Sequence, residues 1–333
     1  MGQLLIESGS LTPGIDPAAW RVPAGTALRY EVPDPVLRPL LPSYAVIEAD
    51  PAIWTGPDDW LLPGWAQLWI VLTQGPVAVS MRRRSVPLGA AMVFGGTSQA
   101  MPVVSHGGVT VVVDISPMGW ARLFDTSAEA ARDSITPLDQ LGHASWAEDL
   151  SALLHASDRA GEVKGLLDAF FLSRLPPPHR DEAAIARLAA ALNGDTTADG
   201  GALADGLGLT PRAVRQLALQ HFGHGPKVLM RRTRFLRALT AMLMADEAPD
   251  FAIAPPGYHD VPHFLRDAKL FLGLTPRRFL AIGMPYQRAA LRARTMVLGA
   301  PLPLLDRTAA TWGGDGCGAP VATSTKTVRA GTG

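Results

Sequence analysis

The sequence has little of what secreted and membrane proteins require. Its 333 residues contain one cysteine, Cys317, so an internal disulfide is excluded and a reducing compartment is favoured. No apolar run approaches the ~18 residues needed to cross a bilayer. A basic segment followed by an apolar run, the mark of a signal peptide, is also missing from the N-terminus. These absences predict a cytoplasmic protein without a membrane partner.

Catalytic and metal-binding signatures are missing as well. The sequence has no Gly-x-Ser-x-Gly elbow, no P-loop and no dinucleotide-binding fingerprint. A metal-binding cupin needs closely spaced histidines with a carboxylate, but His106 is the only histidine before residue 143. His259 and His263 lack a third ligand, and we interpret His221 and His224 as a surface pair. We therefore expect no enzyme activity, no cofactor and no metal.

Charge is scarce, at 18% of residues, and its two signs are unevenly distributed. Residues 1–179 carry 11 Lys and Arg against 18 Asp and Glu, a balance of −7. Residues 180–294 carry 16 against 10, a balance of +6, although the whole chain is neutral. This division predicts that only the C-terminal half meets a polyanion.

Hydrophobic periodicity divides the chain in the same place. Short apolar runs separated by Gly and Pro, from about residue 44 to 115, predict the strands of a β sandwich or small barrel. From residue 117 the apolar spacing becomes helical, and Pro176–Pro178 form a stiff spacer. We expect an α+β protein of two domains: a β-rich domain with helices at 1–175, a Pro-rich linker at 176–184, an all-α domain at 185–284 and a disordered tail at 285–333.

A repeated segment occupies residues 203–279. Each copy ends in a Gly-x-x-Pro corner, at Gly223–Pro226 and Gly273–Pro276, and the two corners are 50 residues apart. In the first copy Thr210 is a natural N-cap followed by Pro at the first helical position, and Asp260 caps the corresponding helix of the second copy. Two helix–turn–helix units of this kind are typical of proteins that read the major groove of DNA.

Polar side chains on the second helix of each unit are the candidate base-reading groups. Arg bonds guanine bidentately and Gln bonds adenine, at roughly 1–3 kcal/mol of discrimination per good pair. Between the units, residues 226–243 form a helix of about 27 Å, close to the ~34 Å of one DNA turn. The candidate DNA-binding residues are Arg212, Arg215 and Gln216, then Val261, His263, Arg266 and Lys269, with Lys227, Arg231 and Arg232 as phosphate contacts.

The C-terminal half resembles the DNA-binding domain of AraC/XylS-type transcriptional regulators over about residues 185–283. The matching text is LADGLGLTPRAV, GHGPK, RRTRFLRAL and GYHDVPHFLRDAKLFLGLTPRRF. The resemblance implies that helices 211–221 and 261–271 enter the major groove of double-stranded DNA. The N-terminal half is similar to cupin-like domains found ahead of such DNA-binding domains, which implies effector binding or association. A small-molecule effector, RNA polymerase and a second copy of the chain are therefore candidate partners.

Two features leave alternatives open. Trp54, Trp65 and Trp69 are candidate walls of an effector pocket, although tryptophans of a strand-rich domain more often fill its core. Pro255-Pro256 falls where the first helix of the second unit should run, and interior prolines cost ~3 kcal/mol each, so we expect that helix to be short or distorted. The alternative function is a ligand-binding or interaction protein whose DNA-binding half has decayed. A third hypothesis is a cupin-type enzyme.

Overall fold

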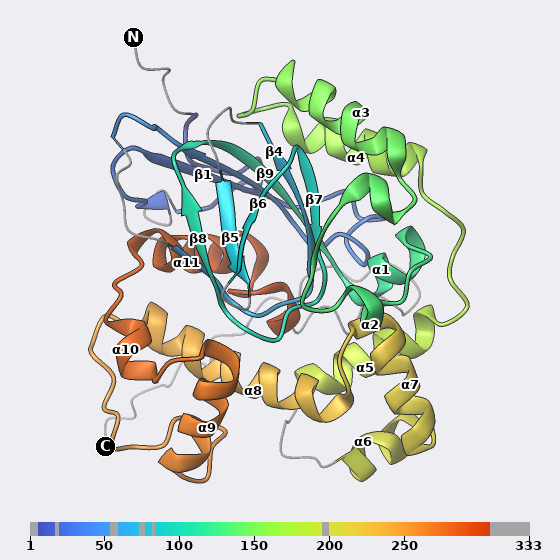
Figure 1. The fold of residues 1–333 in the computed structure, drawn as a ribbon, viewed down its shortest axis with the longest axis vertical. Coiled ribbons are helices and arrows are strands. Elements are labelled where there is room, and N and C mark those ends of the chain that lie inside the picture. The colour runs from blue at the N-terminus through green and yellow to red at the C-terminus, as the bar shows by residue number, and fades with distance from the viewer. Residues whose placement is uncertain are drawn as a thin grey trace, which may run out of the picture.

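Two antiparallel sheets form the N-terminal half of the molecule (Figure 1). The computed structural model describes residues 6–16, 20–53, 59–72, 77–81, 84–194 and 200–306. The six-stranded sheet has the order β1-β2-β9-β4-β7-β10, built from Thr26–Glu31, Tyr44–Ala49, Gly108–Ile115, Ala66–Val71, Ala91–Phe94 and Ile135–Pro137. The four-stranded sheet has the order β3-β8-β5-β6, built from Asp59–Leu61, Met101–Ser105, Val77–Met81 and Arg84–Pro87.

Alternation along the central strands gives the larger sheet two apolar faces. Leu68 and Val111 pack into the cluster shared with the helices, whereas Trp69 and Val112 pack against residues of the smaller sheet, such as Val79. The β-rich half is therefore a sandwich of two sheets. Within the described residues the sheets stay separate, so the barrel form of the prediction does not apply.

Helices cover the larger sheet and continue into the C-terminal half (Figure 1). Tyr44 Oη donates a hydrogen bond to the Asp168 carboxylate at 3.1 Å and so ties α4 to β2. The covering helices are α1 (Pro117–Leu123), α2 (Ala128–Ala131), α3 (Ala144–His155) and α4 (Val163–Ser173). After a link at 174–181 come α5 (Glu182–Asn193), α6 (Gly200–Leu207), α7 (Pro211–Phe222), α8 (Pro226–Met244), α9 (Val261–Leu272), α10 (Pro276–Leu280) and α11 (Pro285–Leu298). Short 3-10 turns occur at Leu138–Leu141 and Pro303–Leu305.

The apolar core does not stop at the proline-rich link. One cluster of buried side chains runs from the sheet through Leu188 of α5 to Val214 of α7. A second cluster packs Ala100 of the N-terminal half against Phe235 of α8 and Phe271 of α9. Helices α5 and α7, and helices α8 and α9, therefore all bury side chains against the strand-rich half.

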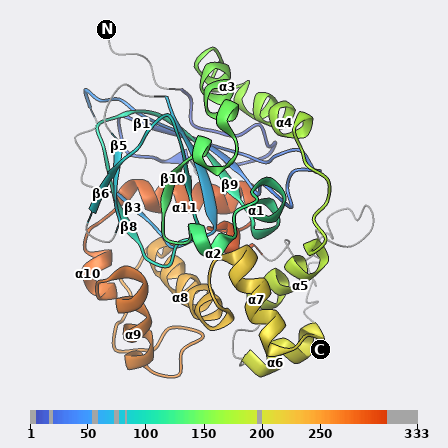
Figure 2. The same ribbon diagram turned by 45° about the vertical axis from the view of Figure 1, so that its right-hand side comes forward.

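The segment after residue 284 corrects the expectation of disorder. Residues 285–298 form α11, which packs against β1 and α8 (Figure 2). Ala289, Ala290 and Ala293 of this helix are buried. Their small side chains let the helix approach the sheet closely. The Gly- and Thr-rich text that prompted the prediction, including Cys317, lies within residues 307–333, outside the described residues. No helix of the described part of the chain has the length and apolarity needed to cross a membrane.

Candidate nucleic-acid interface

Helices α7 and α9 are built in the same way. Thr210 and Asp260 cap their first turns, and each cap side chain accepts a hydrogen bond from the backbone N–H three residues later. Both helices end at a glycine in the left-handed conformation, Gly223 at φ 78° and Gly273 at φ 70°. Residues other than Gly rarely adopt this backbone geometry, so the two glycines determine where both helices end.

The first unit is a helix–turn–helix. Helix α6 ends at Leu207, and Gly208 at φ 63° turns the chain toward the cap of α7. Val214 and Ala218 of α7 are buried, at 1% and 0% exposure, in the cluster that also holds Leu203 of α6. The two helices and the turn between them thus follow the element order of the first copy of the repeat.

The second unit departs from that arrangement. Residues 245–260 are fully described and contain turns and bends but no helix, so the first helix of this unit is absent and not merely short. Pro249, Pro255 and Pro256 remove backbone donors and clash with a preceding helical turn, which explains the loss. The short or distorted helix expected here is therefore replaced by a loop.

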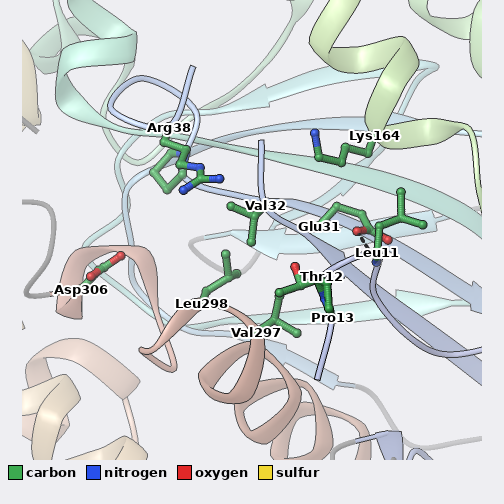
Figure 3. Close-up of a pocket in the computed structure, with 11 residues that line it drawn as sticks. Leu11, Thr12, Pro13, Glu31, Val32, Arg38, Lys164, Val297, Leu298 and Asp306 are labelled. Atoms are coloured by element: carbon green, nitrogen blue, oxygen red, sulfur yellow. Dashed lines mark hydrogen bonds between the residues drawn. The ribbon is translucent and has the colours of Figure 1, made fainter. Parts of the chain in front are cut away.

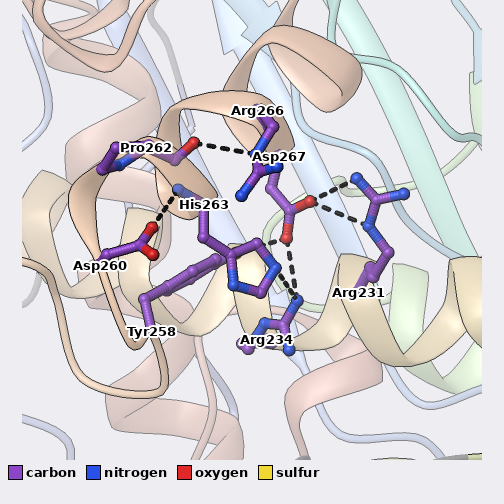
Figure 4. Close-up of polar contacts among 8 residues, drawn as sticks. All are labelled: Arg231, Arg234, Tyr258, Asp260, Pro262, His263, Arg266 and Asp267. Carbon is purple, nitrogen blue, oxygen red and sulfur yellow. Dashed lines mark hydrogen bonds and ion pairs between the residues drawn. The ribbon is translucent and has the colours of Figure 1, made fainter.

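A buried carboxylate holds α9 in place of the missing helix (Figure 4). Asp267 is 0% exposed. Arg231 donates two hydrogen bonds to its Oδ1, at 2.9 and 2.6 Å, and Arg234 donates one to Oδ2 at 3.2 Å. Tyr258 donates to Oδ2 at 2.9 Å, and its pKa is raised above the ordinary value mainly by burial, so the phenol keeps the proton it donates. The network joins α8, α9 and the loop before α9.

The predicted base-reading residues lie mostly on exposed helix faces. Arg212, Arg215 and Gln216 are exposed on α7, and Arg266 and Lys269 are exposed on α9. Four of these five side chains are cations, and they form two pairs, each with a spacing of three residues along its helix. The structure thus presents both helices with the polar face outward.

Two other predicted residues on α9 are less accessible. Val261 is half-buried, and half-buried His263 lies with its Nε2 3.0 Å from the Arg234 guanidinium. Leu265 is 39% exposed beside Arg266, and sequence reasoning did not include it among the interface residues. Its helical position, one residue after buried Phe264, was the available signal.

The predicted phosphate contacts on α8 divide into three cases. Lys227 is exposed, as expected, and Arg231 is half-buried in its pair with Asp267. Arg232 is 2% exposed, so in this structure it contacts no phosphate and that assignment is corrected. Its position follows from helical spacing, because Leu229 and Leu236 are buried on the same face of α8.

Arg232 instead joins the two halves of the molecule. Its guanidinium donates hydrogen bonds to the backbone oxygens of Gly64, at 3.1 Å, and Thr97, at 2.6 Å. Burial lowers the pKa of Arg232 to about 10, which still leaves the side chain charged at neutral pH. The arginine therefore works as a cationic clamp on loops of the strand-rich half.

The loop of residues 95–100, between β7 and β8, meets the helical half at further points. His224 Nε2 lies 3.0 Å from the Gly96 oxygen, and the Ala100 N–H donates to the Phe271 oxygen at 2.7 Å. Burial, reinforced by Arg232, lowers the pKa of His224 to about 4, so the imidazole is neutral. His221 and His224 are 4% and 6% exposed, so their interpretation as a surface pair is wrong. This loop fixes the ends of both α7 and α9.

The predicted tryptophan pocket takes a different form. Trp54 lies outside the described residues. Trp69 is 5% exposed and packs against Phe94, with ring centroids 4.8 Å apart, between the two sheets. Trp65 is half-buried beside a cavity of only about 40 Å³. Trp69 therefore fills the core instead of lining a pocket, as the alternative interpretation held.

A wider cleft opens where the N-terminal half meets α11 (Figure 3). Its volume is about 470 Å³, within the range of small-molecule sites, roughly 300–1,000 Å³. Val32 and Leu298 contribute apolar surface, and Arg38, Lys164 and Glu31 contribute charge. Lys164 pairs with Asp168, and Glu31 accepts a hydrogen bond from the Leu11 N–H at 2.8 Å. No sequence pattern pointed to this cleft, because its lining comes from segments far apart in the chain.

Several solved structures are similar to this chain. Fatty-acid-bound ToxT from Vibrio cholerae strain SCE256 is 12% identical, with a TM-score of 0.41 and coverage of 68% of this chain and 90% of that chain. ToxT from Vibrio cholerae in another crystal form is 10% identical, with a TM-score of 0.42 and coverage of 77% and 97%. The AraC-like activator CuxR is 13% identical, with a TM-score of 0.21 and coverage of 59% and 73%. No protein-family model and no curated protein matches the chain.

Proposed function

We propose that this chain is a sequence-specific DNA-binding transcriptional regulator of the AraC/XylS type, without enzymatic activity, which reads the major groove with α7 and α9. One observation carries the proposal: two similarly capped helices with exposed polar faces lie on either side of α8 (Figures 1 and 2). The 19 residues of α8 span roughly 28 Å at ~1.5 Å per residue. This length suits two reading helices placed about one DNA turn, ~34 Å, apart.

The charge of the helical half supports the same proposal. Residues 180–294 carry the positive balance of +6, while the strand-rich half is acidic. Because phosphate neutralisation supplies most of the affinity for a duplex, the helical half is the part that DNA would approach. The absence of the first helix of the second unit does not remove α9 from this role, since the Asp267 network seats it on α8.

A selection from a library of random duplexes tests the proposal. The full chain, incubated with the library at about 150 mM salt, is expected to enrich one sequence with two short conserved blocks. A bound pool with the base composition of the starting library would contradict sequence-specific regulation.

Arg215→Ala and Arg266→Ala are expected to relax base preference at different blocks of the enriched sequence. Each change removes an exposed guanidinium that can bond a guanine edge, at a cost of about 1–3 kcal/mol for the preferred sequence. The measurement is the selection repeated with each variant, with Arg174→Ala, just after α4, as the control. Unchanged preference in both variants, or the same block affected by both, would argue against separate reading helices.

Lys227→Ala is expected to weaken binding to all duplexes without changing base preference. An exposed lysine at the start of α8 is placed for a phosphate contact, and each such contact contributes about 0.9 to the slope of log K against log salt. Titrations of the enriched duplex and of a scrambled duplex over a salt series measure that slope. A change confined to the enriched duplex would instead make Lys227 a base contact.

We further propose that a small-molecule effector binds in the cleft of Figure 3. The cleft offers apolar surface at Val32 and Leu298 and cations at Arg38 and Lys164, which suits a small ligand with an apolar body and an anionic group. Helix α11 lines this cleft and also packs on α8. A ligand that shifts α11 would therefore also shift α8, the helix on which α7 and α9 pack. A second copy of the chain and RNA polymerase are proposed partners to which no surface is assigned.

The missing helix at 245–260 favours one alternative, a ligand-binding or interaction protein whose DNA-binding half has decayed. Replacing Pro255 and Pro256 with Ala discriminates the two functions. Under the alternative, the double variant gains at least about tenfold in affinity for duplex DNA, because restoring the helix former removes the ~3 kcal/mol penalty of each proline. Under the leading proposal the native chain already binds its enriched sequence.

A further inference from the structure

Three side chains with metal-binding atoms meet where the proline-rich link approaches α7. The ligand atoms of His179, Asp181 and His221 all lie within 4.8 Å of one another. The Oδ2 of Asp181 is 3.0 Å from His221 Nε2 and 4.0 Å from His179 Nδ1. The two imidazole ring centroids are 5.2 Å apart. Around a four-coordinate ion with ligand bonds of about 2.1 Å, ligand atoms lie about 3.4 Å apart, so shifts of about an ångström would form the site.

The carboxylate of Asp181 contacts an imidazole and does not cap the helix that follows it. Asp181 is the N-cap residue of α5, and aspartates in this position normally accept a hydrogen bond from the first turn of the helix. Its side chain makes no such bond and contacts His221 instead. The orientation is therefore set by the cluster and not by the helix end.

Each imidazole places one ring nitrogen in the cluster. His221 is 4% exposed, and its Nε2 faces the Asp181 carboxylate. The Nδ1 of His179 accepts a hydrogen bond from the Asp181 N–H at 3.1 Å, and a bound ion would replace this donor. Two imidazoles and one carboxylate are a donor set that binds Zn²⁺ and other first-row divalent ions, with open positions for water.

We propose that His179, Asp181 and His221 form a binding site for a divalent transition-metal ion, with Zn²⁺ as its representative. The ion would link residues 179–181 to the C-terminal end of α7, which ends at Phe222. This inference goes beyond DNA binding and does not depend on it, because the experiment below measures metal binding by the purified chain alone.

The experiment titrates the full chain, freed of metal with a chelator, with Zn²⁺ by calorimetry and with Co²⁺ by visible absorption. One equivalent is expected to bind, and the Co²⁺ spectrum should show the strong bands of a four- or five-coordinate ion. At a hundredfold excess over Kd, Zn²⁺ should raise the Tm by about 4 °C, since it binds the folded chain preferentially. Absence of stoichiometric binding by the native chain would overturn the proposal.

Variants locate the bound ion. His179→Ala and Asp181→Asn change side chains that are 32% and 35% exposed, so the fold should persist, and each should lose at least about tenfold in Zn²⁺ affinity together with the Tm shift. His221 is left intact because losing a buried side chain would destabilise the fold by itself. His259→Ala, at a side chain that is 95% exposed, and Cys317→Ser are controls expected to bind as the native chain does. Native affinity in either His179→Ala or Asp181→Asn would overturn the assignment.

Discussion

Replacing Asp267 with Ala is expected to lower the free energy of unfolding by about 3–5 kcal/mol, the cost of removing one partner from a buried ion pair. Asp267 is 0% exposed and accepts hydrogen bonds from Arg231, Arg234 and Tyr258. Without the carboxylate, two guanidiniums of α8 face each other beneath α9 with no counter-charge in this network. Urea unfolding of native and variant chains measures the difference, and DNA binding should fall with it because α9 loses its seat.

Asp246→Ala is the matched control for this prediction. Asp246 also pairs with an arginine of the helical half, Arg292 at 2.7 Å, but its side chain is 94% exposed. An exposed pair contributes about 0–1 kcal/mol, so this variant should unfold almost like the native chain. Equal, small losses in both variants would show that Asp267 does not hold α9.

Replacing Arg232 with Met is expected to weaken the attachment of the helical half to the strand-rich half. The change keeps most of the apolar stem but leaves the Thr97 oxygen without this donor, at about 1–3 kcal/mol for an unsatisfied group. The Gly64 oxygen loses one of two hydrogen bonds and keeps the one from the Thr97 N–H, at 3.0 Å. We expect a total loss of about 2–4 kcal/mol of unfolding free energy, because relief from the cost of burying a charge offsets part of the lost hydrogen bonding. Calorimetry should show the single unfolding transition broaden or split as the two halves uncouple.

Lys227→Met is the matched control for Arg232→Met, because it removes a cation from an exposed position of the same helix. Lys227 lies on the same helix but is exposed, and exposed substitutions usually change stability by less than about 0.5 kcal/mol. A single sharp transition in Arg232→Met, at the temperature of Lys227→Met, would contradict the clamp between the halves.

Local rules explain why the bounds of α7 and α9 could be predicted from the sequence. Thr210 and Asp260 are caps whose side chains satisfy backbone donors within three residues, and Gly223 and Gly273 supply left-handed turns that need no distant partner. The prolines before α9 also act locally, and they abolished a helix that we expected to be only distorted.

Distant contacts explain what could not be predicted. Arg232 reaches Thr97, 135 residues earlier in the chain, so its burial depends on how the two halves pack. Asp181 and His221 are 40 residues apart and meet only because α5 packs against α7. Helix α11 was missed because the Gly- and Thr-rich sequence that follows it, considered together with residues 285–298, predicts one disordered tail. The alanines of α11 favour a helix.

The central claim is that α8 holds α7 and α9 at a fixed spacing so that both read one site. Inserting about 5 bp between the two conserved blocks of the enriched duplex tests this claim most directly, because it turns one block to the opposite face of the DNA. Affinity is expected to fall at least about tenfold, to that of a duplex with one block scrambled, since each lost base contact costs about 1–3 kcal/mol. Undiminished affinity for the inserted duplex would contradict the claim.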